Sequence, residues 1–279
     1  MLSESINVTS GAAAIARRCI FCALALCCGV FQSAASFADA DTDKGMAIAV
    51  EADHRNNGFG DSTVDLTMLI AASQDESISR EMRQLTLEVA DEGDKSIMVF
   101  DRPKDLKGTA ILTFSHKTAT DEQWLYLPAL KRVKRISSTD KSGPFMGSEF
   151  AFEDLSSQEV EKYSYKYLRD ERLNGELCFV VERIPADKYS GYSRQVTWVD
   201  QKEYRLQQVD YYDRKNALLK TMVATEYQSY LDHQFWRPGQ LVMTNHLTGK
   251  NTTLKFKDYQ FRTGLQDSDF TPSAVARIR

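Results

Sequence analysis

The sequence predicts an α+β protein built on one strongly curved antiparallel sheet, an unclosed β-barrel of about ten strands with a few helices covering its concave face. Two observations lead to this prediction. Short runs rich in β-branched and aromatic residues follow one another from residue 62 to residue 261, with turn-forming residues between them. Helical patterns are scarce, and a flat open sheet of so many strands tends to curl or split. A curved sheet that few helices cover leaves an apolar cavity.

The N-terminal region has the pattern of a secretory signal peptide. Arg17 and Arg18 precede the uncharged run CIFCALALCCGVF, and small residues follow in QSAASFADA, with cleavage expected after Ala38 or Ala40. A transmembrane helix needs about twenty apolar residues, which disfavours a permanent anchor. The arginine pair leaves twin-arginine export open as an alternative. We therefore expect a signal peptide over residues 1–38 and a single domain over residues 39–279 that is exported to a bacterial periplasm.

Cysteine positions and charge restrict the mature chain further. Four of the five cysteines lie inside the apolar run, so only Cys178 remains after cleavage and no intramolecular disulfide is expected. Cleavage removes two of the 35 basic and one of the 39 acidic residues, which leaves 33 against 38 and a net charge of −5. Proteins that bind nucleic acid usually carry a basic domain, so nucleic acid is not an expected partner.

The first half of the mature chain predicts one helix followed by an antiparallel meander. Met46, Val50 and the alanines between them indicate an amphipathic helix over residues 43–56, ended by an Asn-Asn-Gly sequence at residues 56–58. Strand-like runs follow at residues 62–70, 80–90, 95–100, 109–116 and 122–127. Turn-forming residues separate them at residues 92–94 and 107–108.

The second half predicts three hairpins. Asn174-Gly175 lies between two strand-like runs and is the strongest short hairpin signal. Further turns are expected at residues 200–203 and 248–251, and the alternation around the last turn places apolar side chains on one face of the sheet. Short helical pieces are expected at residues 150–160 and 268–277.

Motifs for catalysis and metal binding are missing from the sequence. None of the four histidines has a partner at metal-ligand spacing, and there is no calcium loop. A nucleophile elbow and the phosphate-binding and dinucleotide-binding loops are also missing. We therefore expect no catalytic residues, no metal and no cofactor, and predict that the protein is not an enzyme. Catalytic pairs that lie far apart in sequence leave an enzyme open as the weaker alternative.

A basic block follows the strand-like run that contains Trp124 and Tyr126. Its members are Lys131, Arg132, Lys134 and Arg135, and Pro128 before them indicates a sheet edge or a break. One interpretation is a solvated edge strand on which positive charge prevents aggregation. The other is a rim that receives lipid phosphates or docks on acids of a partner protein, with about 1 kcal/mol per charge near an anionic membrane.

The segment KSGPFMGSEFAFEDL, residues 141–155, combines apolar side chains with no helical or strand period. Burial of one such side chain is worth about 1.5–3 kcal/mol, so the sheet, a ligand or a partner must cover them. The segment is either a permanent plug of the core or a hinged apolar lid. As ligand-binding or lid residues we name six positions, and as hinges two glycines: Phe145, Met146, Phe150, Phe152, Trp124 and Tyr126, with Gly143 and Gly147.

The stretch from Trp124 to Leu155 resembles the signature of the outer membrane lipoprotein-sorting family of LolA-like proteins. The matching residues are Trp124 to Leu130, Arg135-Ile136, Ser142-Gly143, Phe145 to Ser148, Phe150 and Glu153-Asp154. Pro144 and Glu149 depart from the family pattern, where a small residue and Asp are common. The resemblance extends over nearly the whole mature chain, through MVFDRPKDLKGTAILTFSHK, CFVVERIPAD and TWVDQKEYRLQQVDYYD.

The resemblance implies a fold and a function. The fold is an unclosed β-barrel wrapped over a few helices, whose apolar cavity receives lipoprotein acyl chains in LolA-type carriers. Members of this branch are often encoded beside exporters of the resistance-nodulation-division (RND) type. We therefore expect a periplasmic carrier or chaperone that binds lipid or an acylated lipoprotein and transfers it without chemistry. The alternative is a non-enzymatic periplasmic accessory subunit that docks on an inner-membrane RND-type exporter through the basic block.

Overall fold

The computed structural model describes residues 32–71, 77–232 and 234–278, with side chains described from residue 39 onward. The chain divides into two compact units, Met1–Asp41 and Thr42–Arg279, and the sheet belongs to the second. The predicted signal peptide lies outside the described residues except for residues 32–38, which begin helix α1 (Gln32–His54). No helix in the described ranges is long and apolar enough to cross a membrane.

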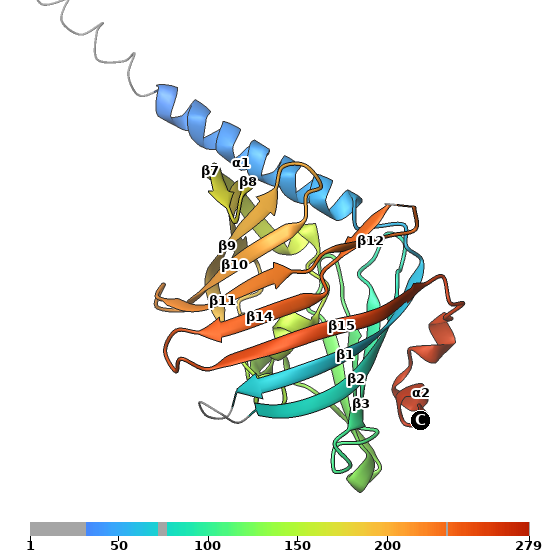
Figure 1. Ribbon diagram of the computed structural model, residues 1–279. Coiled ribbons are helices and arrows are strands. Elements are labelled where there is room, and N and C mark those ends of the chain that lie inside the picture. The colour runs from blue at the N-terminus through green and yellow to red at the C-terminus, as the bar shows by residue number, and fades with distance from the viewer. Residues whose placement is uncertain (1–31, 72–76, 233, 279) are drawn as a thin grey trace, which may run out of the picture. The chain divides into compact units, whose positions relative to one another are not determined.

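In the described ranges, thirteen strands form one antiparallel sheet in the order β6-β5-β4-β3-β2-β1-β15-β14-β11-β10-β9-β8-β7. Figure 1 shows the part of this order from β3 through β1 and β15 to β11. Its strands are β1 (Asp61–Ala71), β2 (Ser77–Leu87), β3 (Lys95–Arg102), β4 (Ala110–Phe114), β5 (Glu122–Leu127), β6 (Arg132–Arg135), β7 (Tyr163–Leu173), β8 (Glu176–Pro185), β9 (Tyr192–Asp200), β10 (Leu206–Asp213), β11 (Leu218–Thr225), β14 (Gln240–Asn245) and β15 (Asn251–Phe261). The pair β12 (Gln228–Tyr230) and β13 (Phe235–Arg237) makes a separate small hairpin.

The sheet joins its first and last strands at its centre and leaves its middle strands at the edges. β1 pairs with β15 through Leu66 opposite Phe256, whereas the edge strands β6 and β7 do not pair with each other. The sheet is therefore curled and unclosed, as predicted. The connection between the two edge strands, residues 136–162, contains the apolar segment of residues 141–155.

The predicted turns agree with the structure, and the predicted helices agree in part, since α1 begins at Gln32 rather than at residue 43. Two-residue turns of the type expected at Asn174-Gly175 need both residues in the left-handed region, and their φ values are 52° and 91°. The predicted C-terminal piece consists of η6 (Asp267–Asp269) and α2 (Pro272–Val275). Around residues 150–160 the chain forms only the short 3-10 turns η4 (Phe152–Leu155) and η5 (Val160–Lys162).

Both faces of the sheet carry buried apolar clusters. Alternation along β3 divides its side chains, with Met98 and Phe100 in the concave-side core and Ile97 and Val99 in a second core. The C-terminal segment with α2 covers the second core through Phe270 and Val275. On the concave side, Ile48 of α1 packs with Tyr165, Val181 and Val199. β3 is thus buried on both faces, because the C-terminal segment packs on its outer face.

Candidate functional site

A cavity of about 780 Å³ lies on the concave side of the sheet. α1 lines it with Ile48, Ala49 and Ala52, and strands from both halves of the sheet supply the remaining walls. The apolar wall includes Val64, Met98, Leu206, Met222, Leu241 and Leu254. Sites for small molecules have volumes of about 300–1,000 Å³, so the cavity is large enough for an apolar ligand.

One part of the cavity is polar. Ser62, Gln84 and Ser96 line it from neighbouring strands, together with the carboxyl groups of Asp53 and Asp94. Burial raises the pKa of Asp94 to about 7, and the nearby carboxylates of Glu159, Glu88 and Asp53 add to the rise. Burial is also the main cause of the raised pKa of Asp53. The cavity therefore has apolar and polar regions, an arrangement that suits an amphiphilic ligand.

The apolar segment of residues 141–155 inserts its phenylalanines into the concave-side core. Phe145 is 0% exposed and Phe150 2% exposed, and both belong to the same cluster as Met68. The Phe145 ring lies 5.9 Å from that of Phe100 and 5.5 Å from that of Phe152. Met146 and Phe152 are partly buried against the same cluster, and only Phe150 of the four lines the cavity. The segment, which connects the two edge strands, thus fills part of the concave-side core, and it is called the plug below.

A buried ion pair fixes this segment to β11. Lys220 Nζ donates to Asp154 Oδ2 at 2.8 Å and to the carbonyl oxygen of Glu149 at 2.9 Å. The Lys220 and Asp154 side chains are only 6% and 5% exposed. Asp154 also accepts a hydrogen bond from the Tyr192 hydroxyl at 2.9 Å and one from the Ala151 amide at 2.7 Å. These bonds hold the second half of the plug.

Further contacts hold the C-terminal side of the plug. The Glu153 carboxylate accepts from Ser190 Oγ at 2.7 Å and from the Gly191 amide at 2.9 Å. Its pKa is raised to about 7, mainly by burial and next by the Asp154 carboxylate. Gln123 Nε2 donates to the Phe152 carbonyl oxygen at 2.9 Å.

The two predicted hinges differ in conformation. Gly147 has φ +76° and follows Met146 at φ +49°, so two successive left-handed residues make the turn at the tip of the plug. Gly143 has no such backbone. Its carbonyl oxygen accepts from the Phe152 amide at 3.2 Å, which closes the base of the segment. Motion about either glycine stays a prediction.

Trp124 and Tyr126 are separated from the other predicted ligand-binding residues. Both pack on the outer-face core of β3 and β4, and neither is among the residues that line the cavity. Trp124 packs against Phe114 in a T-shaped arrangement, with ring centroids 5.0 Å apart. Strand alternation explains the separation, because Gln123, on the other side of β5, is the residue that contacts the plug.

The basic block lies on the edge strand β6 and its approach. Lys131, Arg132, Lys134 and Arg135 are all exposed. Arg132 and Lys134 are opposite Leu127 and Leu125, whereas Arg135 is opposite Trp124, with its guanidinium 5.8 Å from the Trp124 ring centroid. Arg135 also pairs with Glu122. Residues directly opposite in an antiparallel pair share a face, so the block is divided between two faces.

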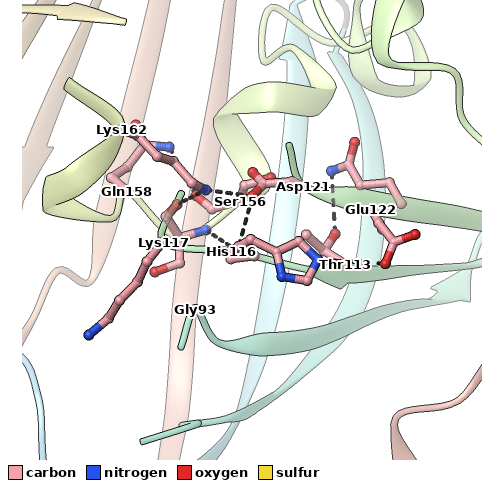
Figure 2. A network of polar contacts seen from close by, with 12 residues as sticks. Gly93, Thr113, His116, Lys117, Asp121, Glu122, Ser156, Gln158 and Lys162 are labelled. Carbon is pink, nitrogen blue, oxygen red and sulfur yellow. Dashed lines mark hydrogen bonds and ion pairs between the residues drawn. The ribbon is translucent and has the colours of Figure 1, made fainter. Parts of the chain in front are cut away.

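A second, polar cavity of about 300 Å³ borders the plug. Its lining includes Lys141, Lys162, Asp121 and Glu153. Figure 2 shows the network next to it: Lys162 Nζ donates to Asp121 Oδ1 at 2.5 Å, and the His116 amide donates to the same oxygen at 3.0 Å. The ammonium of Lys141 donates to the Asp121 carbonyl oxygen. Each of these groups thus has a protein partner, and the network ties the start of the plug to the turn before β5.

Sequence reasoning missed the hairpin β12–β13, which lines the cavity with Trp236 and Arg237. Its rings pack against β15, with Tyr230 5.4 Å from both Tyr259 and Phe261. The available signal was the density of aromatic residues from Tyr227 to Trp236.

In the described ranges, no group of three or more His, Cys, Asp or Glu side chains could hold a metal ion. Cys178, the one cysteine among the described residues, is fully buried, and burial raises the pKa of its thiol to about 11.

Three solved structures share this fold. A domain from Vibrio parahaemolyticus described as an outer membrane lipoprotein-sorting protein has 52% sequence identity and a TM-score of 0.83, covering 85% of this chain and 100% of its own. A DUF1329 family protein from Desulfovibrio piger has 29% identity and a TM-score of 0.80, covering 84% and 99%. A LolA superfamily protein from Nitrosomonas europaea has 23% identity and a TM-score of 0.66, covering 81% and 97%.

A family model described only as an uncharacterised protein matches residues 92–277. No curated protein matches the chain. The curled, unclosed sheet is shared with the LolA superfamily protein, so the fold is LolA-like. Given its identity with the Vibrio domain over that domain's full length, the chain belongs to the outer membrane lipoprotein-sorting family.

Proposed function

We propose that this protein is a periplasmic carrier or chaperone that binds lipid, or the acyl chains of a lipoprotein, and transfers it without chemistry. The observation that carries the proposal is the cavity of about 780 Å³ with its apolar wall and polar region. The description of the Vibrio relative as a lipoprotein-sorting protein supports the same class of cargo.

Export to the periplasm is part of the proposal and rests on the signal-peptide pattern of residues 1–38. Fractionation of the native host compares the full chain with a chain that lacks residues 2–38. The full chain should be found in the periplasmic fraction in a shortened form, and the truncated chain in the cytoplasm. A full chain that stays cytoplasmic would contradict this part.

The cargo is tested by mass spectrometry of organic extracts of the mature protein purified from its native host. Ala224 on β11 is 3% exposed and lines the cavity, so Ala224→Leu adds bulk to the space proposed for cargo. Ala217 lies exposed in the turn before β11, and Ala217→Leu is the matched control. Lipid per protein should fall in the Ala224 variant alone. Wild-type protein that is lipid-free in every preparation would refute the carrier function.

A second candidate function is an accessory subunit that docks on an RND-type exporter. The observation that favours it is the exposed basic block on edge strand β6, of which only Arg135 has an ion-pair partner among the described residues. Charge reversal of the block distinguishes the two functions. Loss of exporter co-purification with unchanged bound lipid would assign docking to the block, whereas loss of lipid with unchanged docking would assign it to a headgroup rim.

A further inference from the structure

Arg237 is the last residue of β13 and lines the cavity from the small hairpin. Its guanidinium lies among aromatic rings, 5.3 Å from the centroid of Phe59 and 5.7 Å from those of Phe235 and Phe261. These rings also pack on one another, with Phe59 6.3 Å from Phe261 and 6.5 Å from Phe235. The hairpin, β15 and the residues after α1 thus hold one cation in a fixed place at the cavity wall.

The hydrogen bonds of Arg237 leave part of its guanidinium unused. Nη1 donates to Asn56 Oδ1 at 3.1 Å and to the Trp236 carbonyl oxygen at 3.0 Å, and Nη2 donates to the Asn56 carbonyl oxygen at 3.4 Å. An arginine side chain has five N–H donors. The Nε–H and the second Nη2–H therefore have no partner among the described residues.

The other arginines that line the cavity differ from Arg237. Arg205 pairs with Asp200 at 2.8 Å and Arg55 with Glu51 at 2.7 Å. Arg183 donates to the amide oxygen of Gln195 at 2.7 Å and to that of Gln158 at 3.4 Å. Within the described part of the chain, Arg237 and Arg183 are thus the two of the four without a carboxylate partner, and Arg237 has one side-chain amide oxygen, that of Asn56, where Arg183 has two.

A partly buried cation without a counter-charge is unfavourable. Burial lowers the pKa of Arg237, and the acidic groups that oppose this, among them Asp94 and Glu88, make no ion pair with it. An anionic group would supply the missing charge and accept the unused N–H donors, which a guanidinium presents in the fork geometry that matches carboxylate and phosphate.

We propose that Arg237 binds the anionic group, a phosphate or a carboxylate, of an amphiphile whose apolar chain occupies the cavity. This inference rests on the carrier function proposed above and adds the chemistry of the cargo's head. A purely structural role, in which Arg237 only clamps the hairpin to Asn56, predicts the same stability loss on substitution but no preference between charged and neutral ligands.

Two lipids that differ only in the phosphate provide the test. Oleoyl lysophosphatidic acid and monooleoylglycerol compete with an apolar fluorescent dye for the delipidated mature protein, and inorganic phosphate is added alone in a third series. Charge-assisted hydrogen bonds contribute about 1.5–3 kcal/mol, so the wild type should prefer the phosphate ester by about tenfold or more. Arg237→Gln should remove this preference and leave the affinity for monooleoylglycerol unchanged.

Two further variants complete the design. Arg237→Lys keeps the charge without the fork and should keep part of the preference. Arg172→Gln, at an exposed residue near the end of β7, is the matched control and should behave as the wild type. Thermal melts check that each variant is folded. If Arg237→Gln unfolds, Arg237→Lys still tests the contact. A preference for the phosphate ester in Arg237→Lys that equals that of the wild type would overturn a contact made by the guanidinium fork.

The outcomes separate the inference from the carrier function. Equal affinity of the wild type for both lipids overturns the anionic head and leaves the carrier intact, as does an equal loss of both in Arg237→Gln. Failure of the wild type to bind either lipid refutes the carrier and the inference together. Inorganic phosphate alone could also displace the dye as well as lysophosphatidic acid does, and lose this ability in Arg237→Gln. That result would overturn the lipid head and assign the site to a free anion.

Discussion

Lys220→Met tests whether the segment of residues 141–155 is a fixed plug. Methionine keeps the length and apolar contacts of the lysine but removes its two bonds, to the Asp154 carboxylate and to the Glu149 carbonyl oxygen. The substitution leaves a carboxylate that is 5% exposed with only the Tyr192 hydroxyl and the Ala151 amide as partners. Removing one member of a buried ion pair costs about 3–5 kcal/mol, so the free energy of unfolding should fall by that amount.

Urea denaturation followed by tryptophan fluorescence measures the change. Lys215→Met, at an exposed lysine in the turn before β11, is the control and should change the stability by less than about 0.5 kcal/mol. The double variant Lys220→Met/Asp154→Asn should recover part of the loss, because no unpaired charge remains buried. A loss below about 1 kcal/mol for Lys220→Met, the value of an exposed pair, would refute the plug and favour a segment that opens.

Three further predictions concern the helix, the cavity and the core. A Cβ at Gly45 would lie 2.7 Å from the Tyr167 amide nitrogen, so Gly45→Ala should push α1 from β7 and lower the melting temperature in a thermal unfolding scan. The raised pKa of Asp94, about 7 against 3.8, means that its protonated form contributes stability below pH 3.8 that is lost as the pH rises through 7. Asp94→Asn should therefore flatten the pH dependence of urea denaturation, by at most about 4 kcal/mol. Phe145→Ala should cost about 3–5 kcal/mol in the same denaturation assay, because the ring is fully buried.

The sequence predicted those parts of the fold that local chemistry determines. The turn at Asn174-Gly175 needs left-handed backbone at two successive residues, and asparagine and glycine adopt it readily. The order of the strands depends on pairing across the chain, which no local pattern contains. β1 and β15 meet at the centre of the sheet although nearly the whole mature chain lies between them. The position of the two open edges, and thus the place of the plug, could not be read from the sequence.

The candidate site was predicted in part for a similar reason. The apolar plug stands out because no strand or helix period explains its phenylalanines. Trp124 and Tyr126 were grouped with it because alternation indicates that two side chains share a face but not which face is concave. Arg237 was missed because its surroundings, Phe59, Phe235 and Phe261, come from three separate segments.

The split of the basic block across strand β6 limits what can bind it. A flat membrane or a flat protein surface laid against one side of the sheet would meet Arg132 and Lys134, or Arg135, but not all three at once. Only a partner that reaches around the open edge could contact the whole block. The charge-reversal experiment therefore needs two variants, one for each side of the sheet. A docking partner that contacts both sides of the edge should be lost in both variants.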